Sequence, residues 1–158
     1  MTDTSPVRWH ANTNPSLRDA RDTIDNHQRR VTTLCHSLAD HIGHPLTDSD
    51  LLHAAANHDQ AERVLGDIPA PAKMRFHALA SAYETAEQQV LADMGLTWTL
   101  TAKEQQMLRL CDRLDAYLFA KSKGVTGAEW DEKRTVLDVM ADKFGARDWV
   151  AAQMEAGI

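Results

Sequence analysis

The chain has 158 residues, of which 43% are hydrophobic and 25% are charged, and these values suit one soluble globular domain built around one core. Seventeen Lys and Arg against 23 Asp and Glu give a net charge of -6, and without a long basic run this argues against a broad surface for a nucleic-acid polymer. The apolar runs are too short to span a bilayer and the opening residues do not resemble a signal segment, so we expect a cytoplasmic protein without a membrane partner.

The first 15 residues contain Pro6 and Pro15 and are expected to form an irregular arm. A helix is predicted from about residue 18 to residue 42, because no Gly or Pro interrupts this stretch. Gly43 and Pro45 are expected to end it. Its apolar residues recur at steps of three and four, which indicates one buried face: Val31, Leu34, Cys35, Leu38 and Ile42.

Thr47 followed by Asp50 resembles a capping box and is expected to start the next helix. This helix would continue into the adjacent pair His58-Asp59. The stretch from Gly66 to residue 71 contains two prolines and predicts a turn. Another helix is expected from about residue 74 to residue 94.

Two further capping signatures follow along the chain. Thr101 with Glu104 predicts the start of a helix that reaches about residue 123, and Thr126 with Glu129 predicts the start of one that runs through about residue 143. A short helix is expected near residues 147–156. Because no alternating strand pattern or repeat appears, the sequence predicts a single all-α domain over residues 1–158.

Both cysteines, Cys35 and Cys111, stand among apolar residues. Buried free thiols are the expected state, since a reducing cytoplasm disfavours disulfides.

Several residues with metal-binding or proton-transfer chemistry fall at positions that could bring them together. His27 precedes Val31 by four residues and therefore shares the core-facing side of its helix. Asp112 lies in a mostly apolar helix, where a buried carboxylate needs a partner. Asp115 lies even nearer the middle of the same stripe, so helical periodicity leaves both carboxylates as candidates.

Two imidazoles and two carboxylates would suit a first-row divalent ion with positions left open for water. Glu62 follows His58 by four residues and is a candidate to transfer a proton.

His27, the His58-Asp59 pair and Asp112 resemble the H…HD…D signature of the HD-domain metal-dependent phosphohydrolases. The resemblance covers roughly residues 7–123 and is most specific to the bacterial 5′-deoxynucleotidases and the related short phage dATP triphosphohydrolases. Three segments carry it: "RWH" at residues 8–10, "HDQAERVLGDIPAPAK" at residues 58–73, and "CDRLDAYL" at residues 111–118.

Carried over by this resemblance, the metal ligands are His27, His58, Asp59 and Asp112, which selects Asp112 over Asp115. The resemblance also implies roles in catalysis or substrate binding for five residues. These are the catalytic Glu62, the substrate-side Asp67, the phosphate-binding Arg8, the sugar-gating Trp9 and the phosphate cation Lys73. The chain departs from the family in a longer spacing between Trp9 and His27 and in a shorter overall length, closer to the phage enzymes.

The resemblance implies an enzyme that hydrolyses 5′-deoxynucleotides with a divalent ion, Co²⁺, Mn²⁺, Zn²⁺ or Mg²⁺, in a bacterial or phage-infected cell. Attack at a monophosphate would release a deoxynucleoside and phosphate, whereas attack at the α-phosphorus of a substrate such as dATP would release triphosphate. Two alternatives stay open: an HD hydrolase of another nucleotide phosphoester, and a catalytically silent nucleotide-binding module. A homo-oligomer is expected, because the resembling proteins form them, with Trp130 and Trp149 as core or subunit-contact residues.

Overall fold

The computed structural model describes residues 22–157, and eight helices account for its regular structure. The prediction of an all-α fold is therefore confirmed for this part of the chain, while the expected arm over residues 1–15 lies outside it. The helices are α1 (Ile24–Ile42), α2 (Leu51–Asn57), α3 (Glu62–Leu65), α4 (Ala70–Arg75), α5 (His77–Asp93), α6 (Ala102–Ser122), α7 (Ala128–Asp142) and α8 (Arg147–Ala156).

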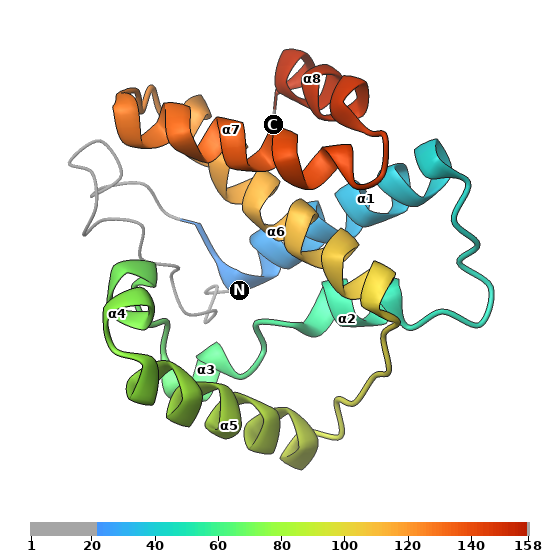
Figure 1. The fold of residues 1–158 in the computed structure, drawn as a ribbon. Helices are drawn as coiled ribbons and strands as arrows, with labels where there is room; N and C mark the ends of the chain where they lie inside the picture. The colour runs from blue at the N-terminus through green and yellow to red at the C-terminus, as the bar shows by residue number, and fades with distance from the viewer. Residues whose placement is uncertain (1–21, 158) are drawn as a thin grey trace, which may run out of the picture.

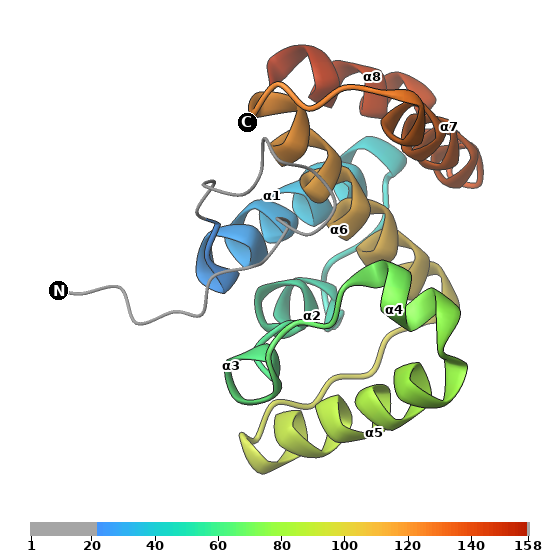
Figure 2. The same ribbon diagram turned by 90° about the vertical axis from the view of Figure 1, so that its left-hand side faces the viewer.

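The centre of the molecule is formed by α1, α2 and α6, which pack against one another. The helices α7 and α8 extend this packing beyond α6, and α5 lies at the opposite end of the molecule, against α3 and α4 (Figures 1 and 2). The buried apolar stripe of α1 faces that of α6, as its period predicted. The main members of this core are Val31, Leu34, Cys35, Leu38, Leu51, Met107, Leu110, Cys111, Leu114 and Leu118.

The first helix is held by a cap at each end. The Thr23 side chain accepts a hydrogen bond from the Asn26 amide at 3.2 Å, so α1 begins at Ile24 and not near residue 18 as predicted. Gly43 ends the helix as expected. Its φ of 63° is left-handed, a conformation that glycine adopts without steric cost, and its amide returns to the last carbonyls of the helix.

The prediction that Thr47 caps α2 was wrong. Asp48 has a left-handed φ of 61°, which separates Thr47 from the helix. The Ser49 hydroxyl instead accepts a hydrogen bond from the Leu51 amide at 3.1 Å, and the Asp50 carboxylate accepts one from the Thr99 amide at 2.8 Å. The helix therefore starts later, at Leu51.

The same helix also ends earlier than predicted. It stops at Asn57, and residues 58–61 form turns before α3 begins. His58 and Asp59 therefore lie just beyond a helix end, where the backbone can depart from the regular angle between successive helical side chains.

The expected turn over residues 66–71 is shorter than predicted, because α4 already begins at Ala70.

The expected helix over residues 74–94 is in fact two helices. Phe76, with φ -120° and ψ 83°, separates α4 from α5, although no Gly or Pro marks this break in the sequence.

The capping box of Thr101 and Glu104 is confirmed, with both reciprocal hydrogen bonds present at the start of α6. The corresponding prediction for Thr126 was wrong. Gly127, at φ 129°, takes the cap position of α7 and leaves Thr126 outside the helix. The short last helix was predicted correctly at residues 147–156.

The two cysteines are buried and free, as expected. Burial and the neighbouring Cys35 raise the pKa of the Cys111 thiol, so it remains neutral. Among residues 22–157, no helix combines the length and the apolar character that crossing a membrane requires.

Candidate metal centre

Three segments that are distant in sequence meet between α1 and α6. His27 extends from the first turns of α1, His58 and Asp59 follow α2, and Asp112 comes from the middle of α6. The His27 side chain is fully buried, whereas 36% of the Asp112 side chain is exposed. The cluster thus has a closed side at His27 and an open side at Asp112.

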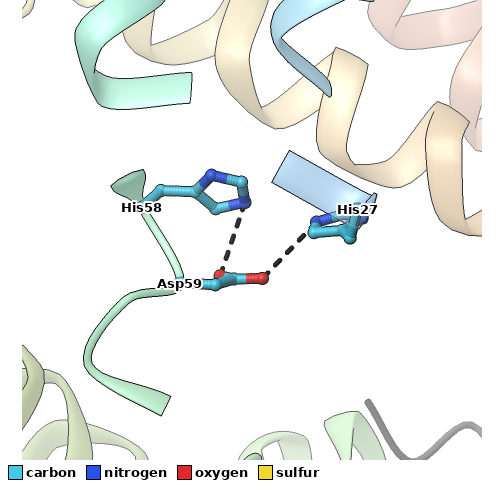
Figure 3. A group of neighbouring side chains, drawn as sticks. All are labelled: His27, His58 and Asp59. Atoms are coloured by element: carbon cyan, nitrogen blue, oxygen red, sulfur yellow. Dashed lines mark ion pairs between the residues drawn. The ribbon is translucent and has the colours of Figure 1, made fainter. Parts of the chain in front are cut away.

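The nitrogen and oxygen atoms of these four side chains converge on one small volume. The Nε2 atom of His27 lies 3.0 Å from Asp112 Oδ1 and 3.4 Å from Asp59 Oδ2. The Nε2 atom of His58 lies 3.4 Å from Asp59 Oδ1 and 3.8 Å from Asp112 Oδ1. Figure 3 shows Asp59 pointing between the two imidazoles. Atoms that each lie about 2.0–2.2 Å from one ion are separated by about 3–4 Å, so these distances fit a shared divalent ion.

In both imidazoles the second ring nitrogen, Nδ1, makes a contact that orients the ring. His58 Nδ1 lies 2.9 Å from the carbonyl oxygen of Ala55, which can only accept, so Nδ1 carries a proton and Nε2 can present its lone pair. His27 Nδ1 lies 2.7 Å from Asp115 Oδ2. The Nε2 atom of His58 is buried and makes no hydrogen bond within the described residues, as expected for an atom reserved for an ion.

Asp59 is held in place through its backbone. The buried Gln28 side chain, one residue after His27, accepts a hydrogen bond from the Asp59 amide at 3.0 Å. This contact ties the turn after α2 to the first helix and fixes the direction of the Asp59 side chain. Sequence reasoning missed Gln28, although its position next to His27 on a buried helix was visible.

The electrostatics of the cluster favour a cation. Burial alone would lower the pKa of His58, but the negative charges of Asp59 and Asp112 outweigh it and raise this pKa to about 9. The same negative potential would favour a divalent cation in this volume. The donor set, the separations and the orientation of His58 Nε2 all fit a metal ion with mixed nitrogen and oxygen ligands.

The two carboxylates that periodicity left open occupy different positions around His27. Asp112 approaches Nε2, on the side of His58 and Asp59, whereas Asp115 lies behind the ring against Nδ1. Asp115 also accepts hydrogen bonds from Arg30, a contact that no sequence pattern indicated.

The remaining candidates among the described residues gather on the side of α3, α4 and α5. Glu62 is buried at the start of α3. The Lys73 ammonium lies 4.5 Å from the ring centroid of Tyr83, whose hydroxyl donates a hydrogen bond to the Gly66 carbonyl. Burial raises the pKa of Tyr83, and the negative charges of nearby Glu62, Glu87, Asp67 and Asp59 raise it further. Tyr83 and Glu87 were missed from the sequence, because nothing local distinguishes them from other residues of a surface helix.

Comparison with known proteins identifies the family. A family profile described as 5′-deoxynucleotidase YfbR-like matches residues 7–106, well over half of the 158 residues. The chain belongs to the YfbR-like family. At the level of the family, this gives a 5′-deoxynucleotidase-like hydrolase and implies a divalent metal, for which the cluster between α1 and α6 is a possible site. No curated protein and no solved structure matches the chain.

The matched range of the YfbR-like profile contains six of the predicted site residues that the structure describes, and also Arg8 and Trp9. Arg8 and Trp9 lie outside the described residues, so the prediction that they bind phosphate and sugar has no structural counterpart here. Asp112 lies six residues beyond the matched range, and its place beside His27 comes from the structure alone. The six residues are His27, His58, Asp59, Glu62, Asp67 and Lys73.

Proposed function

We propose that the protein hydrolyses 5′-deoxynucleotides with a divalent ion held by His27, His58, Asp59 and Asp112. The observation that carries the proposal is the convergence of two imidazole Nε2 atoms and two carboxylates at 3.0–3.8 Å. When bound, such an ion supplies a Lewis acid that polarises a phosphoryl oxygen and lowers the pKa of water.

The reaction is a single displacement at phosphorus. The oxygen of water forms a bond to phosphorus, the bond from phosphorus to the 5′ oxygen breaks, and the deoxynucleoside leaves with its 5′ hydroxyl. Glu62 accepts the proton of the attacking water and returns one to the leaving oxygen. Two observations support this role: Glu62 is buried, and its amide donates a hydrogen bond to the Asp59 carbonyl at 3.0 Å, next to the cluster.

The other residues bind and orient the substrate. Lys73 supplies a positive charge for the phosphate, on the same side as Glu62, and Asp67 contacts the reacting phosphate or the attacking water. Arg8 binds phosphate oxygens through its bidentate guanidinium. Trp9 excludes a 2′ hydroxyl by packing against the sugar, so that a ribonucleotide must tilt its phosphate away from the attacking water.

The substrate class divides into monophosphates and triphosphates, and we propose that a deoxynucleoside triphosphate such as dATP is hydrolysed as well. The decisive experiment incubates the protein with each dNMP and dNTP in the presence of Co²⁺, Mn²⁺, Zn²⁺ or Mg²⁺ and identifies the products. Release of phosphate from dNMP, or of triphosphate from dNTP, is the expected result. Hydrolysis of a cyclic nucleotide or a guanosine alarmone alone would contradict the proposal.

We further propose that the protein is a homo-oligomer. Trp149 does not support this, since it is 5% exposed and its indole donates a hydrogen bond to Ser37 at 3.0 Å within the core. The support comes from family resemblance and from apolar side chains exposed near the junction of α4 and α5, namely Met74, Phe76 and Leu79. Light scattering at micromolar concentration is expected to give at least a dimer, and a monomeric mass would contradict it.

A further inference from the structure

A buried chain of charged groups lies behind His27, on the side away from His58 and Asp59. Asp115 and Asp22 are each 1% exposed, and the guanidinium of Arg30 lies between them. Arg30 donates to Asp115 Oδ1 at 2.7 Å and to Oδ2 at 2.9 Å, and to the two oxygens of Asp22 at 3.1 and 2.8 Å. Such a doubly bidentate arrangement fixes the position of both carboxylates.

The positions of the two carboxylates around His27 follow from equal residue spacings on α1 and α6. His27 and Arg30 are three residues apart on α1, and Asp112 and Asp115 are three residues apart on α6, so each pair shares one helix face. With α1 packed against α6, Asp112 meets the Nε2 side of His27 at 3.0 Å, and Asp115 meets the Nδ1 side at 2.7 Å. The buried ring therefore has a carboxylate at each nitrogen.

A second metal site in this group can be rejected. Asp22, His27 and Asp115 offer ligand atoms within 4.8 Å of one another, which alone would resemble such a site. The Arg30 guanidinium, however, already contacts all four carboxylate oxygens of Asp22 and Asp115. Arginine keeps its positive charge at all relevant pH values, so it occupies the place of a cation.

We propose that Asp115 is a positioning residue for the metal centre: clamped by Arg30, it accepts the Nδ1 proton of His27 and so directs the lone pair of Nε2 toward the ion. This inference rests on the proposed metal site. An imidazole that binds a metal through one nitrogen commonly donates the other N–H to a carboxylate, which fixes both the tautomer and the ring orientation. Asp115 has no contact with substrate in this role and acts only through His27.

The hydrogen bonds from Arg30 to Asp115 predict how Asp115→Asn changes the protonation of His27. Arg30 requires an acceptor at both Asp115 oxygens, and an amide has only one. If the amide oxygen stays with Arg30 Nε, the amide nitrogen faces His27 Nδ1 and donates to it. That contact would place the imidazole proton on Nε2, where it blocks the metal. Loss of such an outer carboxylate typically weakens metal binding by about 10- to 100-fold.

The test measures the Co²⁺ affinity of the full-length protein by calorimetric titration. Asp115→Asn and Asp115→Ala are expected to bind Co²⁺ about 10- to 100-fold more weakly than the wild type, and Arg30→Lys less severely, because lysine keeps the charge but loses the bidentate geometry. The matched control is Glu104→Gln. Glu104 is another buried, hydrogen-bonded carboxylate of α6, 5% exposed, and its loss should lower stability without changing the Co²⁺ affinity.

A second readout separates positioning from folding. In the Co²⁺ form, besides the Nδ1 proton of His58 that bonds to the Ala55 carbonyl, the wild type should show a strongly shifted, slowly exchanging imidazole N–H resonance from His27, because its acceptor is 1% exposed. That resonance should vanish in Asp115→Ala and persist in Glu104→Gln. If Asp115→Ala does not fold, Arg30→Lys and Asp115→Asn still report the affinity.

The possible outcomes distinguish this inference from the proposed function. Unchanged Co²⁺ affinity in Asp115→Asn and Arg30→Lys, or a loss no greater than in Glu104→Gln, would overturn the positioning role. If the wild type binds Co²⁺ and the Asp115 variants bind it weakly, the positioning role stands even when no deoxynucleotide is hydrolysed, and only the proposed function fails.

Discussion

His58 is the residue on which the metal site depends most directly. Its Nδ1 atom is committed to the Ala55 carbonyl, and its buried Nε2 atom faces the carboxylates of Asp59 and Asp112. His58→Ala removes one of four donors and is expected to abolish metal-dependent hydrolysis and to lower the metal content of the purified protein. Metal analysis and a rate assay check this, with His36→Ala, an exposed histidine of α1, as the matched control. Full activity in His58→Ala would contradict the site.

Substitution of Glu62 tests the catalytic step separately from metal binding. Because it is proposed to transfer protons and not to hold the ion, Glu62→Gln should lower kcat by about 10²- to 10⁴-fold while Co²⁺ affinity stays near that of the wild type. The measurement combines steady-state kinetics with a Co²⁺ titration. Equal losses of affinity and rate would instead make Glu62 a ligand.

The sequence identified the residues of the candidate site better than it explained their arrangement. Spacing and resemblance pointed to His27, His58, Asp59 and Asp112, and the structure brings these four together. Helical periodicity alone could not separate Asp112 from Asp115, since residues three apart share a helix face. The separation arises because α6 places the two carboxylates against different nitrogens of one imidazole, which is a tertiary relation.

At the scale of elements, a local capping pattern predicted the start of a helix correctly only where the backbone conformation after the threonine was helical. The same capping pattern occurs at Thr47, Thr101 and Thr126, yet only Thr101 caps a helix. A left-handed Asp48 follows Thr47, and Gly127 follows Thr126. These backbone choices were not visible in the pattern, because Asp and Gly are also compatible with a first helical turn. The break at Phe76 likewise has no local signal.

The capping box of α6 predicts a dependence of stability on pH. Burial would raise the pKa of Glu104, but hydrogen bonds from Ser49, Thr101 and His44 outweigh it and lower this pKa to about 2. The pKa in the unfolded chain is about 4.3, so ionised Glu104 stabilises the fold above pH 4.3 or so, and this contribution is lost as the pH falls toward 2.

Glu104→Gln should therefore lower the free energy of unfolding by about 1–2 kcal/mol at pH 7, with a difference from the wild type that shrinks between about pH 4.3 and pH 2. Urea unfolding at several pH values measures it. Glu132→Gln, an exposed glutamate of α7, is the control and should be nearly neutral. A difference that grows on acidification would contradict the assigned role of the carboxylate.

At the scale of the whole molecule, the candidate metal site connects three separate parts of the fold. His27 belongs to α1, His58 and Asp59 to the turn after α2, and Asp112 to α6, and these helices build the central core. An ion that binds all four side chains binds the folded state and not the unfolded chain, where these segments are far apart. Metal binding should therefore raise the free energy of unfolding of the entire domain.

Free Co²⁺ at 100 times its Kd is expected to stabilise the protein by about 2.7 kcal/mol, or roughly 5–10 °C in Tm for a chain of this size. Thermal unfolding with excess chelator and with a series of Co²⁺ concentrations measures this shift. In Asp59→Ala the shift should be largely lost, because the carboxylate that lies between both imidazoles is missing. Glu104→Gln should start from a lower Tm and still gain the full shift, since the partners of Glu104 are Thr101, Ser49 and His44 and not the four donors. An equal Co²⁺ shift in the wild type and in Asp59→Ala would mean that the ion binds elsewhere, and the cluster between α1 and α6 would then lose its proposed role.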